Sequence, residues 1–320
     1  MTFVTKPNSI LFLLLVSFFN ATAQMGPSSL NAPGIAINTD YLPASRYIRP
    51  EDSVKTHSTT AIRRLSMGIG FNLSTWKDTS TGAFRNWTMA VSGSYMKFTN
   101  EKYESEIMPE ELLGTDISLI HTRNLRGKWS LMAMASAGVY TDLQKISYKD
   151  LFINGGVLVI KQQSPRFVYG FGAAFTNAFG TPMLLPGLYV QWSTGKKFKV
   201  EIVVPEKFRV SHMLNDRIET GIAVRMNGGS FDVEKHIDNR RLLSYKEMTA
   251  GWENNFYFTK LISVNIAGGA TLLRSVDYRK KSLSEMFKTM PEHRLATNWF
   301  VSAGVRLHFK PVRTVHPGGQ

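Results

Sequence analysis

A strict two-residue alternation runs through the segment NWFVSAGVRLHF, from Asn298 to Phe309. Every odd position from Trp299 onward is apolar, and every even position except Phe300 is polar or glycine. Successive side chains of a β-strand point to opposite faces, so a period of two predicts a strand. This strand is expected to have one apolar face and one face of small or polar side chains.

The same period recurs along the chain, at 65–74, 167–176, 198–204, 218–226 and 262–272. Short polar turns alternate with longer, charged connections. This predicts hairpins with short turns at one end of the strands and long loops at the other end. The longer connections are expected at 99–112, 141–150, 177–184, 235–241 and 277–297. The exception is the tight corner Pro205-Glu206-Lys207. Counting the segments gives about 14 strands, or about 12 if weak ones merge, in an all-β chain.

Two architectures fit such a pattern. A soluble sandwich buries its apolar face, whereas a transmembrane barrel turns that face to lipid and its small or polar face to the lumen. The alternating segments reach roughly ten to fifteen residues, which exceeds the usual soluble strand and suits a tilted membrane-crossing strand. We therefore predict a transmembrane antiparallel up-and-down β-barrel. Closure would pair every backbone group without a free edge, and no dry core would be required.

Tryptophan placement also favours the barrel. Aromatic residues gather where membrane-crossing strands meet the two interfaces. Five of the six tryptophans lie within about three residues of a predicted strand end, so we expect an interfacial girdle made of Trp76, Trp87, Trp129, Trp192 and Trp299.

The first 23 residues have the features of a secretory leader. Lys6 is followed by the apolar run Ile10 to Phe19, which is too short to span a bilayer as a helix, and then by the small-x-small site Ala21-Thr22-Ala23. We expect a signal peptide at 1–23, rather than a membrane anchor, and a barrel at 24–309. Residues 24–60 form an N-terminal segment that could lie partly outside the barrel, and residues 310–320 follow the barrel as a C-terminal tail.

Composition limits the partners. The formal net charge is +14, but the basic residues are dispersed, and export argues against nucleic acid as a partner. Anionic lipid head groups or an anionic solute in a pore fit this charge better. The chain contains no Cys, so neither a disulfide framework nor a lipid-anchored Cys is expected.

The last strand resembles the C-terminal strand of bacterial outer-membrane proteins, which ends in an aromatic residue and is recognised by the barrel insertion machinery. The matching positions are Trp299, Val301, Val305, Leu307 and Phe309. In that pattern the aromatic residue usually comes last, whereas here residues 310–320 follow. The resemblance implies contact with the insertion machinery and residence among outer-membrane lipids, including lipopolysaccharide.

The mature chain as a whole is similar to a domain-of-unknown-function family of outer-membrane β-barrels. The similarity rests on the stretches LYVQWSTGKKFKVEIVVPEKFRVSHMLNDRIETGIAV and MTAGWENNFYFTKLISVNIAGGATL. It implies the architecture and the outer-membrane location, and it says nothing about activity.

Catalytic and metal-binding patterns are not evident. The seven His are scattered without ligand spacing, so no metal, cofactor or catalytic residue is predicted. His236 or His293, with Asp238 or Glu292 nearby, could serve a hydrolase from a long loop, but an ordinary exposed His is the favoured interpretation.

Charged residues on the inner faces are the better lead. By parity the lumen should receive Lys199, Glu201, Glu219, Arg225, Glu253 and Arg306. They could form a structural network that plugs the barrel or a constriction that selects a solute. Residues 277–296 could form a short amphipathic helix over the barrel mouth, or a plain loop.

The sequence is compatible with three functions. The first is a porin-like channel or passive transporter for small solutes. The second is a structural or assembly barrel that docks an envelope or secretion partner, and the third is an outer-membrane hydrolase. The sequence predicts neither the solute nor the oligomeric state.

Overall fold

The computed structural model describes residues 33–78, 82–176, 183–195, 197–237, 240–281 and 290–309. The predicted leader, the tail 310–320 and the central part of the 277–296 connection lie outside these residues. The described elements are β1 (Gly34–Ile48), β2 (Lys55–Lys77), β3 (Phe84–Glu101), β4 (Glu111–Asn124), η1 (Arg126–Lys128), β5 (Trp129–Thr141), η2 (Tyr148–Asp150), β6 (Leu151–Ser164), β7 (Phe167–Thr176), β8 (Met183–Thr194), β9 (Phe198–Val204), β10 (Lys207–Asn215), β11 (Ile218–Ile237), β12 (Arg240–Tyr257), β13 (Ile262–Arg279), β14 (His293–Leu295) and β15 (Trp299–His308).

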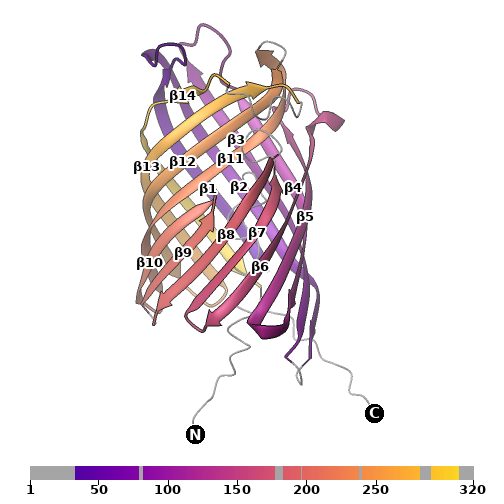
Figure 1. Cartoon of the computed structure of the whole chain (residues 1–320). Helices are drawn as coiled ribbons and strands as arrows, with labels where there is room; N and C mark the ends of the chain where they lie inside the picture. Colours follow the sequence, from indigo (N-terminus) through magenta and orange to yellow (C-terminus); the bar gives the residue numbers. More distant parts are fainter. Residues whose placement is uncertain are drawn as a thin grey trace.

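The strands form one closed antiparallel barrel (Figure 1). Each strand from β1 to β13 pairs with its neighbour in the sequence, and β15 pairs with both β13 and β1 to close the cylinder. The short β14 pairs with the same two strands, so β14 and β15 are two pieces of one barrel position. The barrel therefore has 14 strand positions, which confirms the predicted fold class and strand number.

Both ends of the described chain lie at one rim of the barrel. Gly34 is opposite His308 in the closing ladder, and the Phe309 N–H donates to the Pro33 carbonyl at 2.9 Å. In Figure 1 this rim, where the described strands begin and end, is the lower one, and β14 lies at the upper rim. We call these rims the terminus side, where hairpins turn tightly, and the loop side, where the predicted longer connections leave.

The outer surface carries a belt of exposed apolar side chains. On β2 the outward positions are Leu65, Met67, Ile69, Phe71 and Leu73, and on β15 they are Val301, Val305 and Leu307. At the loop-side ends of β11–β13 this face is instead polar, with Lys246 partly exposed and Asp232 and Asp277 buried. No helix in the described ranges is long and apolar enough to cross a membrane. The apolar belt is thus of limited height, as a lipid-facing surface requires.

The loop-side half of the interior is packed with apolar side chains. This loop-side cluster contains Leu42, Tyr47, Ile62, Met96, Phe98, Met108, Leu112, Tyr140, Phe152, Phe231, Val233, Leu242, Leu243, Tyr245, Val276, Tyr278 and Leu295. The rings of Phe98 and Tyr245, from strands on different sides of the barrel, meet edge to face at 6.0 Å. The expectation that no dry core is needed therefore does not describe this half, because its inward positions are apolar.

The wall is interrupted between β8 and β11. The β9–β10 hairpin turns at Pro205–Glu206, the predicted tight corner, and its ladder with β11 ends at Lys207 opposite Arg225. Further along β11, Asp232 pairs in parallel with Thr141 of β5. In Figure 1, β9 and β10 occupy the lower part of the wall, whereas β11–β13 continue to the upper rim. We call the intervening region, bordered by 183–187 and 227–231, the seam.

Candidate functional site

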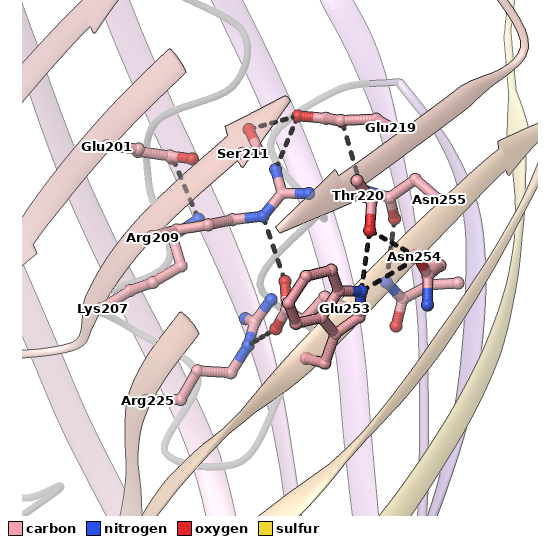
Figure 2. A network of polar contacts seen from close by, with 12 residues as sticks. Glu201, Lys207, Arg209, Ser211, Glu219, Thr220, Arg225, Glu253, Asn254 and Asn255 are labelled. Atoms are coloured by element: carbon pink, nitrogen blue, oxygen red, sulfur yellow. Dashed lines mark hydrogen bonds and ion pairs between the residues drawn. The ribbon is translucent and has the colours of Figure 1, made fainter. Parts of the chain in front are cut away.

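Arg209 on β10 is the centre of a group of inward ion pairs on β9–β12 (Figure 2). Its Nη1 lies 3.0 Å from Glu219 Oε1, and its Nε lies 3.1 Å from Glu253 Oε2. Arg225 Nε contacts the other oxygen of Glu253. We call these residues, with the neighbouring Lys207–Glu201 pair at 2.9 Å, the ionic cluster.

The local sequence of β11 makes this arrangement possible. Gly221 lies between Ser211 on β10 and Glu253 on β12, so the Arg209 side chain can reach across β11. A Cβ atom at Gly221 would lie 2.4 Å from the Val210 carbonyl oxygen. The inward position next to it on β11 is the small Ala223. Small residues on one strand therefore allow long charged side chains from its two neighbours to meet.

Neutral donors complete the surroundings of Glu219. Its Oε1 accepts a hydrogen bond from the Ser211 hydroxyl at 2.6 Å, and its Oε2 accepts from Tyr257 at 2.8 Å and from Asn255 at 3.2 Å. The ionic cluster contains three cations and three carboxylates, so its charges balance. Such a network holds strands β9–β12 together and gives this side of the lumen a polar surface without a strong preference for either sign of charge.

The opposite side of the terminus-side lumen is apolar. Strands β4–β9 bury an inner cluster of Ile120, Met132, Met134, Leu158, Ile160, Val168 and Tyr189, with Val203 packed against it. We call this the apolar wall. Its polar group at Tyr189 is satisfied by donation to Gln191 at 2.7 Å. The lumen therefore has one charged side and one apolar side at the same height.

A second ionic layer separates the two halves of the interior. Arg64 on β2 reaches Glu247 on β12 through two contacts, Nη1–Oε1 at 3.2 Å and Nη2–Oε2, and also lies 3.2 Å from Asp40. Tyr245 donates to the same Glu247 carboxylate. Because β2 and β12 are not neighbours in the sheet, this pair crosses the interior rather than running along the wall.

A third group of charges lies at the loop-side ends of β11–β13, where its carboxylates are buried. Lys246 pairs with Asp277 at 2.8 Å, and Arg241 pairs with Asp232 at 2.7 Å. Lys281 reaches Asp232 at 2.8 Å, so the first residues after β13 fold back onto β11. Asp232 and Asp277 are only 2% and 0% exposed, so these ion pairs rather than water compensate their charges.

The structure places the six residues predicted for the lumen on inner faces of the wall. Of these, Glu201, Glu219, Arg225 and Glu253 belong to the ionic cluster, while Lys199 and Arg306 lie on the inner faces of β9 and β15. Sequence reasoning missed Arg209, which is the centre of the ionic cluster. It also missed Arg64 and Glu247, which form the second ionic layer. The signal was available for Arg209, because it alternates with the apolar Phe208 and Val210.

The tryptophans predicted for a girdle lie near strand ends. Trp76 and Trp87 are exposed near the β2–β3 turn, and Trp129 begins β5. Two of them lie under cations: Arg85 is 5.4 Å from the Trp76 ring centroid, and a Lys on β6 is similarly placed over Trp129. Trp192 is exposed near the terminus-side end of β8, and Trp299 is exposed at the opposite end of the barrel's last strand.

The described residues contain no cluster of three or more His, Cys, Asp or Glu that could hold a metal ion. The prediction that His293 lies on a loop is wrong, because it belongs to β14. There it pairs with a neighbouring ring, with its Nδ1 2.8 Å from the Tyr47 hydroxyl. The His236 side chain and Asp238 lie outside the described atoms.

The family described as Domain of unknown function (DUF6268) matches residues 19–308. The chain belongs to this family. No curated protein matches it.

Among solved structures, an outer-membrane channel from Pseudomonas putida F1 is 10% identical with a TM-score of 0.40, over 91% of this chain and 100% of that chain. The β domain of the Bordetella autotransporter BrkA is 10% identical with a TM-score of 0.34, and the match covers 87% of this chain and 100% of that chain. The Pseudomonas putida toluene transporter TodX is 7% identical with a TM-score of 0.24, and the match covers 92% of this chain and 96% of that chain.

Proposed function

We propose that the protein is an outer-membrane barrel that lets small solutes cross passively. The observation that carries this proposal is the partly exposed inner face of the terminus-side half. Lys199, Asn255, Asn265 and Gly187 all face inward, yet none is fully buried. Inward side chains are shielded from lipid, so this exposure is exposure to an internal space lined by polar groups and by the apolar wall.

The surroundings of the barrel follow from the same proposal. In outer-membrane barrels the tight turns face the periplasm and the longer loops face outward. The apolar belt would then contact lipid chains, and exposed cations near the loop side, such as Lys281 and Arg294, would meet lipopolysaccharide head groups. The exposed outward positions of β15, from Trp299 to Leu307, support recognition by the barrel insertion machinery.

The packed loop-side cluster restricts the path that a solute can take through the barrel. A permanently open axial bore would need an empty loop-side half, whereas Phe98 and Tyr245 meet inside it. Passage would therefore require movement of this cluster or an exit through the wall. Small solutes fit this narrow space better than large ones do.

Permeation can be measured directly. The refolded protein in liposomes should increase the swelling rate in arabinose above that of protein-free liposomes, and planar bilayers should show small discrete conductance steps. Liposomes that contain only heat-denatured protein are the matched control. If neither swelling nor conductance exceeds this control for folded protein, passage of hydrophilic solutes and ions through the barrel is overturned.

A second candidate is a structural or assembly barrel that docks an envelope partner. It is favoured by the packed loop-side interior and by the partly exposed cations Lys246 and Lys281 at that end of the barrel. Recovery of a stoichiometric envelope protein with the detergent-solubilised barrel, lost on reversal of charge at Lys246, would support this candidate.

A further inference from the structure

The seam brings two incompletely paired strand edges to the same side of the barrel. The ladder of β8 with β9 begins only at Leu188 opposite Val204, which leaves 183–187 without a strand on that side in the described residues. Pro186 within this edge has no N–H to offer. The opposing edge of β11 is likewise without a ladder partner from 227 to 231 in the part of the chain that the structure describes; 228–231 are buried there, whereas Asn227 is partly exposed.

The inner surface beside the seam is formed by small residues. The inward positions of β7 and β8 include Gly172, Ala174, Leu185 and Gly187, all partly exposed. A Cβ atom built on Gly187 would find no neighbour closer than 3.7 Å. There is thus room inside the wall at this height, and it adjoins the apolar wall through Tyr189 on the same strand.

Glu206 lies at the base of the seam, in the β9–β10 turn. Its Oε2 is buried and has no hydrogen-bond partner among the described residues. Its backbone carbonyl accepts from Met226 N–H at 2.8 Å, so the turn is fixed against β11. A buried acceptor without a donor is unfavourable, so a donor supplied by a bound molecule would stabilise this carboxylate.

We propose that the seam is a lateral binding and exit site for small amphipathic molecules that have an apolar body and a hydrogen-bond-donating head, such as an alcohol or an amine. The apolar body lies along Gly172, Ala174 and Gly187, and the head donates to Glu206. The loop-side cluster blocks the axial path, so the molecule moves sideways between β8 and β11 to or from the lipid. This inference rests on the proposed transport function and gives it a substrate class.

The test uses N-phenyl-1-naphthylamine, an apolar amine that fluoresces once it enters a membrane. Intact cells producing the barrel should take up the probe at least about threefold faster than cells without it. Gly187→Phe should remove most of this gain, because its ring would fill the space beside the seam. Gly93→Phe is the matched control, because Gly93 faces outward on β3 and its Cβ would have neighbours no closer than 3.5 Å.

The head-group contact has its own test. Glu206→Leu should slow uptake of the amine probe severalfold and leave uptake of diphenylhexatriene, which has no donor, unchanged. Folding of each variant is checked by the heat-dependent shift in gel mobility, and Ala174→Phe replaces Gly187→Phe if the latter does not fold.

The outcomes separate the two proposals. If wild-type protein passes arabinose in liposomes but the folded Gly187→Phe or Ala174→Phe variant takes up the amine at the wild-type rate, the lateral site is wrong and the transport function stands. If Glu206→Leu slows both probes equally, the contact with the head group is wrong. If wild-type protein passes neither arabinose nor the amine, the transport function itself is overturned.

Discussion

Arg64 and Glu247 join two non-adjacent strands through a two-point ion pair across the interior of the barrel. Both side chains are almost fully buried, at 6% and 2% exposure. The pair separates the partly exposed terminus-side lumen from the packed loop-side half. It therefore sets both the stability of the cylinder and the height at which an axial path closes.

Removing one partner of this pair should destabilise the barrel more than removing both. Glu247→Leu leaves the Arg64 cation in a dry interior, with only Asp40 nearby, and should cost about 3–5 kcal/mol. The double variant Arg64→Met with Glu247→Leu should recover most of this loss. Urea unfolding of the refolded protein, followed by tryptophan fluorescence, gives the free energies; additive effects of the two changes would contradict the prediction.

Widening the loop-side half should increase conductance. Phe98→Ala combined with Tyr245→Ala removes the two rings that meet inside the barrel, so the mean conductance step in planar bilayers should rise severalfold. Phe171→Ala removes a lipid-facing ring and serves as the control, with no expected change. An unchanged step in a folded double variant would show that these rings do not limit the path.

Gly221 should tolerate no side chain. In Gly221→Ala the new Cβ would press on the Val210 carbonyl oxygen and on Ser211, which should lower the free energy of unfolding by about 1–3 kcal/mol and loosen the Arg209–Glu253 pair. Gly187→Ala, where a Cβ meets nothing closer than 3.7 Å, should change stability little. Equal losses at the two positions would refute this account of the ionic cluster.

A charge in the apolar belt should be costly only if the belt faces lipid. Ile222 is 54% exposed on the outside of β11, and Ile222→Arg should destabilise the bilayer-inserted protein by about 2–4 kcal/mol. Val54→Arg, in the exposed β1–β2 connection, is the matched control and should cost little. Unfolding measured in lipid vesicles compares the two, and equal stability would place the belt outside the bilayer.

The sequence predicted which face each strand residue occupies, because a two-residue period is local information. Glu219 and Arg225 were assigned to the lumen in this way, and the structure places them on the inner face. The partner of Glu247 could not be predicted, because Arg64 is 183 residues away. Their meeting depends on strand number and tilt, which parity does not encode.

The packed interior and the seam were missed for related reasons. Leu242 and Leu243 are consecutive and both buried, so the alternation breaks at the loop-side end of β12. Two consecutive leucines in the sequence could have indicated that the alternation of apolar outward and polar inward residues ends there. The corner at Pro205 was recognised, but the parallel contact of Asp232 with Thr141 joins distant segments, and nothing in either local pattern predicts it.

The hydrogen bond from Phe309 to Pro33 brings the beginning and the end of the described barrel together. In a barrel closed in this way, any strand could be the first one in the chain. The ends could be fused by a linker and new ones cut at an outward loop, such as the connection containing Val54. Such a circular permutant would move the aromatic-terminated strand to the middle of the polypeptide while keeping its place in the ring.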